Sequence, residues 1–352
     1  MIQAMKTRDL DATPRSLRRW GLGAFTLDRK VRAVLGAEAP AGWEPTGAGR
    51  GYYLDIMEHI VRGALPWVSP DGRVIDPVLG KESAQVSPRL ASSAAVLLHF
   101  GRMPEVRDAT FRCMTHCCRA MASGEAKGFS PDFWTREIVT AYMALQGVAG
   151  AADWRRWAAD LSSFEPERLY SVVRADGGGI ASLGNWCVYS GAGEAMREAA
   201  GLRPGRPMLW GDRFFDKYVG GQFPVWTRNG MYRDPGGPIT YDITTRLQIA
   251  SALAFGYRGR LRAPLEELLR RGGLTTLLFV SPDGHVPYGG RSAAFHFREA
   301  IVAALCELEA RRYRRVDPAL AGAFKRQAHL SALAMRRWVL DMDPWRHIQN
   351  GF

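Results

Sequence analysis

Apolar residues recur three and four positions apart along most of the chain, a spacing that predicts amphipathic helices. Several of these segments begin with proline in the first turn and several end at glycine, as helices commonly do. Strand-like alternation is confined to short stretches such as Arg73–Pro77 and Leu277–Val280. The predicted helices are Tyr52–Ala64, Pro88–Phe100, Pro104–Met121, Pro131–Val148, Ala151–Leu161, Gly193–Gly201, Met208–Val219, Ile239–Tyr257, Ala263–Thr275, Ser292–Arg312 and Pro318–Leu340.

This series of helices predicts an all-α fold. Short Gly- and Pro-containing connections join the helices, no Ser/Gly linker divides them, and no repeat of fixed period indicates a solenoid. Such a series is typical of helical hairpins around one core. We expect an N-terminal extension and first helix over residues 1–48, and an (α/α) toroid built from helical hairpins over residues 49–352. The chain stops at Asp343–Phe352 on what reads as the start of a loop, so a minimal or incomplete toroid is expected.

Composition narrows the class of protein without deciding it. Hydrophobic residues make up 47% of the 352 residues and charged residues 23%, as in ordinary globular proteins. No run of about 18 apolar residues occurs, so we expect no membrane-spanning helix. Lys and Arg number 47 against 35 Asp and Glu, a net charge of +12 carried almost entirely by arginine. This balance favours a polyanionic partner, although a GC-rich coding sequence would produce the same arginine excess.

Cysteine usage and the N-terminal region indicate a reduced, intracellular protein. Cys113, His116, Cys117 and Cys118 lie close together, but in a helical segment with no second Cys pair to complete four zinc ligands. We therefore expect buried free thiols, no metal and no cofactor. The apolar stretch 20–25 is too short for a signal peptide, which predicts a cytoplasmic location.

Four polar and aromatic loops lead into predicted helices, and in a toroid such loops would meet at one rim. They are Gly184-Asn185-Trp186, the stretch 229–242, the stretch 281–292 with 295–299 after it, and the stretch 84–89. We expect the following side chains around one cavity: Asn185, Tyr241, Arg246, Tyr288, Arg291 and His296.

Several of these residues also have a structural explanation. Tyr241 can be a core tyrosine whose hydroxyl caps or bridges a loop. Asn185 can be a helix N-cap. Asp242 and Arg246, four positions apart, can form a surface ion pair. His296 can be a core histidine, and the tryptophans, Trp134, Trp186 and Trp226, can belong to the core.

The loop motifs resemble those of the (α/α)-toroid polysaccharide lyases, in particular the heparinase II/III and alginate lyase groups, over about residues 50–350. The motifs concerned are the Asn-Trp helix opening, Asn-Gly-x-Tyr followed by a second Tyr and an Arg, and Asp-Gly followed by Gly-Arg-Ser. The resemblance implies β-elimination on a uronic-acid-containing glycan, with Asn185 neutralising the carboxylate and Tyr241 as the base. It also implies catalytic roles for Arg246 and His296. The implied substrate-binding residues are Trp186, Tyr232, Tyr288, Arg291 and Arg89.

The chain departs from this family in three respects. Trp186 stands where some relatives have His after the Asn, and neither a C-terminal β-sandwich nor a signal peptide is evident. The chemistry is nevertheless suited to these residues. Removing a proton next to a carboxylate creates enolate charge that cations and amide donors stabilise, and a tyrosine base needs cations nearby.

Three other functions remain open at this point. A glycoside hydrolase on the same toroid would use two carboxylates among Asp234, Asp242 and Glu299. A non-catalytic binder of acidic polymer or nucleic acid would suit the charge, but no nucleic-acid-binding motif is found. Elimination or cyclisation of a small molecule is also compatible. We expect an acidic oligo- or polysaccharide as the partner, with no nucleic acid and no membrane, while the oligomeric state stays open.

Overall fold

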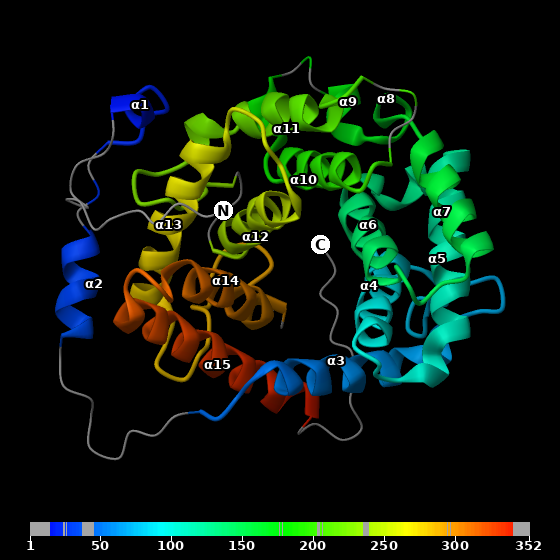
Figure 1. Cartoon of the computed structure of the whole chain (residues 1–352), viewed down its shortest axis with the longest axis horizontal. Coiled ribbons are helices and arrows are strands. Elements are labelled where there is room, and N and C mark those ends of the chain that lie inside the picture. Colours follow the sequence, from blue (N-terminus) through cyan, green and yellow to red (C-terminus); the bar gives the residue numbers. More distant parts are fainter. Residues whose placement is uncertain are drawn as a thin grey trace. The chain divides into compact units, whose positions relative to one another are not determined.

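The structure is a computed structural model that describes residues 15–23, 25, 27–36, 46–175, 177, 179–202, 205, 207–234, 239–293, 295 and 297–340. These residues are mostly α-helical, which confirms the all-α character (Figure 1). The chain divides into two compact units. Unit 1 comprises Met1–Gly51, Gln222–Ser251 and Arg260–Phe352, and unit 2 comprises Tyr52–Gly221 and Ala252–Gly259. The domain boundary expected after residue 48 stays a prediction.

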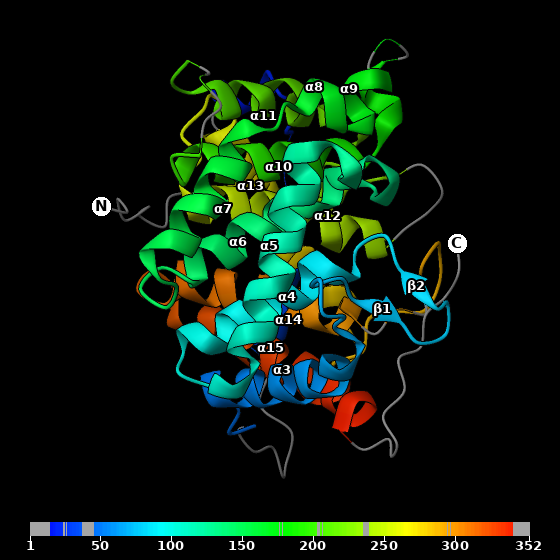
Figure 2. The ribbon, with the colours of Figure 1, turned by 90° about the vertical axis from the view of Figure 1, so that its right-hand side faces the viewer.

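Unit 2 is a group of helices with one short β-hairpin at its edge (Figure 2). The hairpin pairs Ile75 with Glu82 and Asp76 with Lys81. In chain order the elements are most of α3 (Arg50–Ala64), η1 (Leu65–Trp67), β1 (Ile75–Asp76), β2 (Lys81–Glu82), α4 (Val86–His99), η2 (Pro104–Val106), α5 (Arg107–Ser123), η3 (Glu125–Phe129), η4 (Pro131–Phe133), α6 (Trp134–Ala144), α7 (Ala151–Ser163), α8 (Pro166–Leu169), α9 (Ser171–Ala175), η6 (Ile180–Leu183), α10 (Trp186–Ala199) and α11 (Trp210–Gly220).

Helix α10 lies at the centre of unit 2 because small residues let its neighbours approach closely. It packs against both α6 and α11. A Cβ added at Gly193 would lie 2.8 Å from the Thr135 Cβ of α6. A Cβ at Gly211 of α11 would lie 2.3 Å from the carbonyl oxygen of Glu194. Larger side chains at these glycines would therefore push the helices apart.

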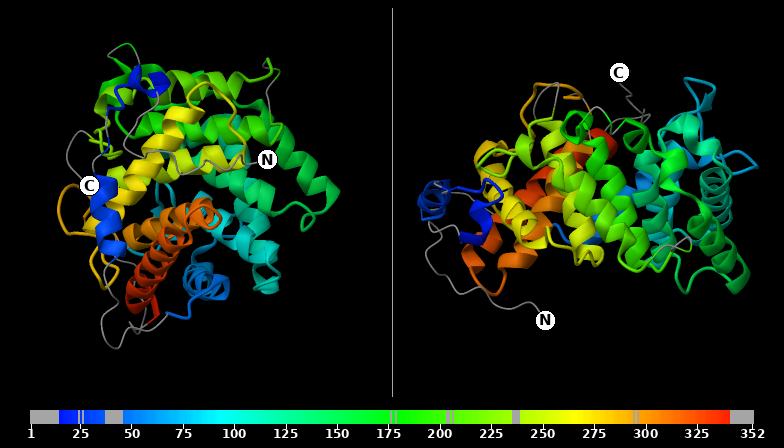
Figure 3. Two further views of the ribbon diagram at one scale, coloured as in Figure 1. Left: turned by 60° about the vertical axis from the view of Figure 1, so that its left-hand side comes forward. Right: turned by 90° about the horizontal axis from the view of Figure 1, so that it is seen from above.

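Unit 1 is built around the hairpin of α14 (Phe297–Tyr313) and α15 (Pro318–Leu340), which lie side by side (Figure 3). The residues between them, 314–317, form a short turn in which the Asp317 carboxylate accepts a hydrogen bond from the Leu320 N–H, 3.1 Å away. The other elements are α1 (Arg15–Arg18), α2 (Leu27–Leu35), η7 (Phe223–Val225), most of α12 (Thr240–Phe255) and α13 (Arg262–Phe279).

Each predicted helix overlaps an observed one, but some boundaries differ. The helix Pro318–Leu340 has the predicted bounds, whereas the helix expected at Ser292 begins at Phe297. The strand expected over Leu277–Val280 is wrong, because α13 continues to Phe279. A short apolar run fits a strand and the end of a helix equally well, so periodicity does not separate the two. The stretch Arg73–Pro77 does contain β1.

None of the helices in the described ranges is long and apolar enough to cross a membrane.

Candidate active site

Two of the four loops singled out in the sequence meet at Tyr241 in unit 1. The Tyr241 hydroxyl lies 3.0 Å from the Ser292 Oγ. The preceding hydroxyl, that of Thr240, donates a hydrogen bond of 3.2 Å to the Ser292 carbonyl oxygen. The start of α12 and the end of the loop 281–292 are thus joined by two hydrogen bonds, and the Tyr241 ring is held between them.

Arg291 supplies a cation directly beside this tyrosine. Its Cζ lies 4.2 Å from the centroid of the Tyr241 ring, within the range of a cation–π interaction. Its Nη2 donates to the Asp234 Oδ2 at 3.0 Å. The Asp234 side chain is only 2% exposed, whereas that of Arg291 is 45% exposed. Asp234 therefore orients the guanidinium while solvent still reaches it, as an anionic ligand requires.

Arg246 lies in the interior rather than on the surface. It forms an ion pair with Asp242, with Nη2 2.7 Å from Oδ2, and both side chains are 1% exposed. Its Nη2 also donates to the Thr276 Oγ1 of α13 at 3.0 Å. The surface pair weighed as an alternative is in fact a buried one. The catalytic role expected for Arg246 stays a prediction, and its visible contacts tie α12 to α13.

The Asp242–Arg246 pair also holds the loop that precedes α12. The Asp242 Oδ1 accepts a hydrogen bond of 2.7 Å from the backbone N–H of Tyr232. Tyr232 itself is 2% exposed, and its hydroxyl donates to the Gln222 Oε1 at 2.7 Å. Gly230 in the same loop has φ +74° and lies against α13, where a Cβ would be 2.4 Å from the Gly272 nitrogen. This part of the loop is therefore firmly anchored.

The loop 281–292 carries an exposed tyrosine, and a buried arginine of α14 binds the backbone of this segment. Tyr288 is 83% exposed, whereas Arg298 on α14 is 2% exposed and donates to the carbonyl oxygens of Pro287 and Ala293. Burial lowers the pKa of Arg298. Glu299 accepts a hydrogen bond of 3.1 Å from the Val286 N–H. The predicted catalytic residue His296 lies outside the described residues.

Three of the predicted site residues belong to unit 2. Asn185 stands at the N-cap position of α10 and is 1% exposed, but its side chain makes no capping hydrogen bond. Trp186 packs edge-on against Phe133, with ring centroids 4.7 Å apart. Arg89 is exposed on α4. The cavity expected to hold both Asn185 and Tyr241 would span the two units and stays a prediction.

The sequence motifs did not identify the partners that position Tyr241 and Arg291. Ser292 stood inside the Gly-Arg-Ser motif without a role, and Asp234 appeared only as a candidate hydrolase acid. Their actual roles depend on contacts between segments more than fifty residues apart. For Ser292, the sequence offered one indication of this role, which is its position next to Arg291.

The cysteine cluster on α5 is a buried structural element. All five cysteines are free and buried. Burial raises the pKa of the Cys113 thiol to about 12 and holds that of the Cys117 thiol well above its ordinary value. The His116 Nε2 lies 2.9 Å from the Glu82 Oε1 of β2. Among the described residues, no group of three or more His, Cys, Asp or Glu could hold a metal ion.

Comparisons of the chain with protein-family models, with curated proteins and with solved structures give no significant match.

Proposed function

We propose that this chain is a carbon–oxygen lyase that cleaves a uronic-acid-containing glycan by β-elimination, with Tyr241 as its base. The observation that carries the proposal is the placement of the Tyr241 phenol, held by Ser292 and flanked by the half-exposed Arg291. A tyrosine needs a nearby positive charge to act as a base at neutral pH. The net charge of +12 agrees with an anionic substrate.

The proposed reaction takes place on one sugar ring. The Tyr241 phenolate removes the C5 proton, and the electron pair moves toward the carboxylate to give an enolate. The enolate then collapses to a C4–C5 double bond as the C4–O bond to the next sugar breaks. The leaving oxygen takes a proton from the Tyr241 hydroxyl, which restores the phenolate. The Arg291 guanidinium would stabilise the enolate charge, and the same role, which the resemblance implies for the Asn185 amide, stays a prediction.

The remaining residues have supporting roles in this proposal. Arg246 and Asp242 act as positioning residues, because the pair holds the Tyr232 N–H and hence the loop before α12. Tyr288, which is exposed, would contact the glycan outside the reacting ring. The roles that the resemblance implies for Arg89, Trp186, Tyr232 and His296 stay predictions. Within unit 1 helices α14 and α15 pack together, and within unit 2 helices α10 and α11 do so. These paired helices support the proposal of an (α/α) toroid.

The three carboxylates considered for a hydrolase are already engaged within unit 1. Asp234 binds Arg291, Asp242 binds Arg246, and Glu299 accepts a backbone N–H. A glycosidase needs one protonated acid and one free carboxylate about 5–10 Å apart across the sugar. Among the described residues of unit 1, these contacts do not favour such a pair, so we do not propose hydrolysis.

The decisive experiment is incubation of the protein with acidic glycans, including polygalacturonate, alginate and heparin. We expect ultraviolet absorbance from the new double bond, which is conjugated with the carboxylate, to rise in step with new reducing ends. The Tyr241→Phe variant is the control, because it keeps the ring and loses only the hydroxyl. New reducing ends without that absorbance would instead establish hydrolysis.

A further inference from the structure

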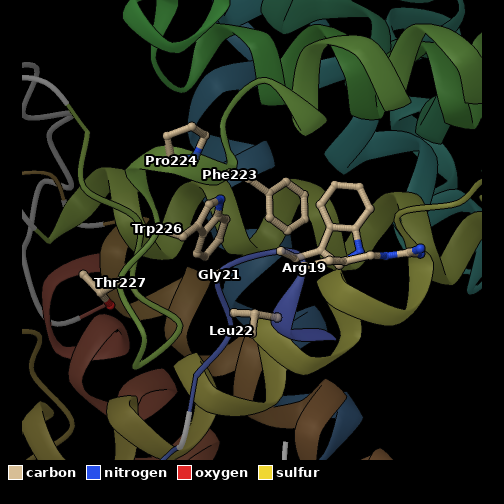
Figure 4. Close-up of a pocket in the computed structure, with 8 residues that line it drawn as sticks. Arg19, Gly21, Leu22, Phe223, Pro224, Trp226 and Thr227 are labelled. Atoms are coloured by element: carbon tan, nitrogen blue, oxygen red, sulfur yellow. The ribbon is translucent and has the colours of Figure 1, made fainter. Parts of the chain in front are cut away.

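A pocket of about 350 Å³ opens in unit 1 between the chain that follows α1 and the helix η7 (Figure 4). This volume lies at the lower end of the range for ligand pockets, roughly 300–1,000 Å³. Three aromatic side chains, Trp20, Phe223 and Trp226, line it together with Arg19. None of these residues belongs to the Tyr241 site, and the proposed elimination gives them no task.

Aromatic rings line the pocket, and a cation lies beside them. In Figure 4 the rings of Trp226 and Phe223 follow one another along the pocket. The Trp20 and Phe223 centroids are 4.8 Å apart with the rings tilted by 38°. Rings in contact at this angle leave no slot for a flat nucleobase between them. Rings with centroids this close overlap, so a sugar can stack by its C–H face only on a ring face that stays open to the pocket.

Trp226 adds a hydrogen-bond donor to the pocket. The residue is 9% exposed, and within the described chain its indole N–H has no hydrogen-bond partner. Its nitrogen lies on the side of Phe223 and Pro224 in Figure 4. A buried donor without an acceptor is costly, so an acceptor oxygen brought by a ligand would be favourable. Sugar hydroxyl and carboxylate groups are such acceptors.

Arg19 determines the charge of the ligand that fits. Its Cζ lies 5.5 Å from the centroid of the Trp20 ring, so a charged group on a ring stacked there would lie close to the guanidinium. A cationic ligand, which an aromatic pocket would otherwise suit, is repelled by this arginine. An acidic sugar would satisfy the aromatic face, the indole donor and the cation together.

We infer that this aromatic pocket is a subsite for one or two sugar rings of an acidic glycan. The sugar stacks on the open ring face of this aromatic lining, places its acidic group at Arg19 and accepts a hydrogen bond from Trp226. The choice of an acidic glycan rests on the proposed function. The pocket is connected to the Tyr241 site, because Trp226 packs on Tyr232, with centroids 5.3 Å apart, and the Tyr232 N–H binds Asp242.

The test is calorimetric titration of the full-length Tyr241→Phe protein, in which turnover is blocked. The probes are tetragalacturonate, tetramannuronate and a heparin tetrasaccharide, with neutral maltotetraose for comparison. We expect at least one acidic probe to bind, and Trp20→Ala to weaken that binding about tenfold. Arg19→Gln should weaken the acidic probe and leave any maltotetraose binding unchanged. Trp154→Ala is the matched control, because it removes a partly buried tryptophan that is stacked on Tyr142 in unit 2. It should leave the affinity for the acidic probe unchanged.

Trp226→Phe is a second pocket variant, and it keeps the proposal testable if Trp20→Ala prevents folding. The substitution keeps an aromatic ring and breaks no hydrogen bond within the described chain, so thermal unfolding should stay close to that of the parent. We expect binding of the acidic probe to weaken severalfold. Parental affinity in both Trp20→Ala and Trp226→Phe, or no binding of any acidic probe, would overturn the subsite.

Failure of the lyase proposal has a separate signature: wild-type protein forms no unsaturated product while binding still depends on Trp20.

Discussion

Two tyrosines, one in each unit, differ in the charged group beside the ring: a carboxylate at Tyr170 and a guanidinium at Tyr241. Tyr170 in unit 2 is fully buried, and its hydroxyl donates to the Glu194 carboxylate at 2.5 Å. Burial and this carboxylate raise its pKa well above the ordinary value. Tyr241 in unit 1 is partly exposed and lies beside the cation Arg291. A carboxylate beside a phenol keeps it protonated, which makes Tyr170 unsuited to the role of a base.

Each unit also has a buried ion pair, and the two pairs differ in the parts of the structure that they contact. In unit 2 Arg197 binds Glu194 and also donates to the carbonyl oxygens of Leu202 and Phe164. This network stays among packed helices and their ends. In unit 1 the Asp242–Arg246 pair is equally buried, but it reaches a loop through the Tyr232 N–H. The first pair therefore stabilises the packing of unit 2, and the second connects stability to the candidate site.

The largest expected effect is on turnover in Tyr241→Phe compared with Tyr170→Phe. If Tyr241 is the base, its loss should lower kcat by about 10²- to 10⁴-fold while costing only about 1 kcal/mol of stability. Tyr170→Phe should keep most of the activity and lower the free energy of unfolding by about 1–3 kcal/mol, because it removes one buried hydrogen bond to Glu194, which keeps Arg197 as a donor. Rates from the ultraviolet assay and urea unfolding measure both. A Tyr241→Phe protein with more than about a third of wild-type activity would contradict the comparison.

The next effect separates the two buried ion pairs. Asp242→Asn and Glu194→Gln each leave a buried arginine uncompensated and should cost about 3–5 kcal/mol of stability. Only Asp242→Asn should also lower kcat among molecules that remain folded, because it weakens the anchor of the loop before α12. Activity is measured well below the unfolding temperature and divided by the folded fraction. Equal residual activity in the two variants would show that the Asp242 pair acts on stability alone.

Sequence periodicity was sufficient for the helices, but not for the surroundings of individual side chains. The four-residue spacing of Asp242 and Arg246 predicted their pairing. It could not show that the pair is buried, because that depends on packing by residues distant in the chain, such as Gly230 and Gly272. Unit 1 likewise combines three separate stretches of chain, an arrangement that no local pattern records.

A smaller effect is expected from removing the cation beside Tyr241. Arg291→Gln should lower kcat/KM about tenfold and weaken its dependence on ionic strength. Its effect on stability should be below about 1 kcal/mol, because the Arg291 side chain is half-exposed. Arg102→Gln in unit 2, which breaks a surface ion pair with Asp55, is the control and should leave kcat/KM unchanged. Equal kcat/KM in both variants would remove Arg291 from the mechanism.

The smallest expected effect is an acid sensitivity that His329 gives to unit 1. Burial, followed by the nearby charge of Lys325, lowers the pKa of this histidine below its ordinary value of 6.5, and Glu307 opposes the shift. The unfolded chain therefore binds the proton more readily, so stability falls as the pH drops through 6.5 toward the lower native pKa. Above that window both states are neutral and His329 contributes nothing. Urea unfolding at about pH 7.5 and about pH 5.5 should show a smaller acid-induced loss in His329→Gln than in wild type. An identical loss in the two proteins would assign the acid sensitivity to other groups.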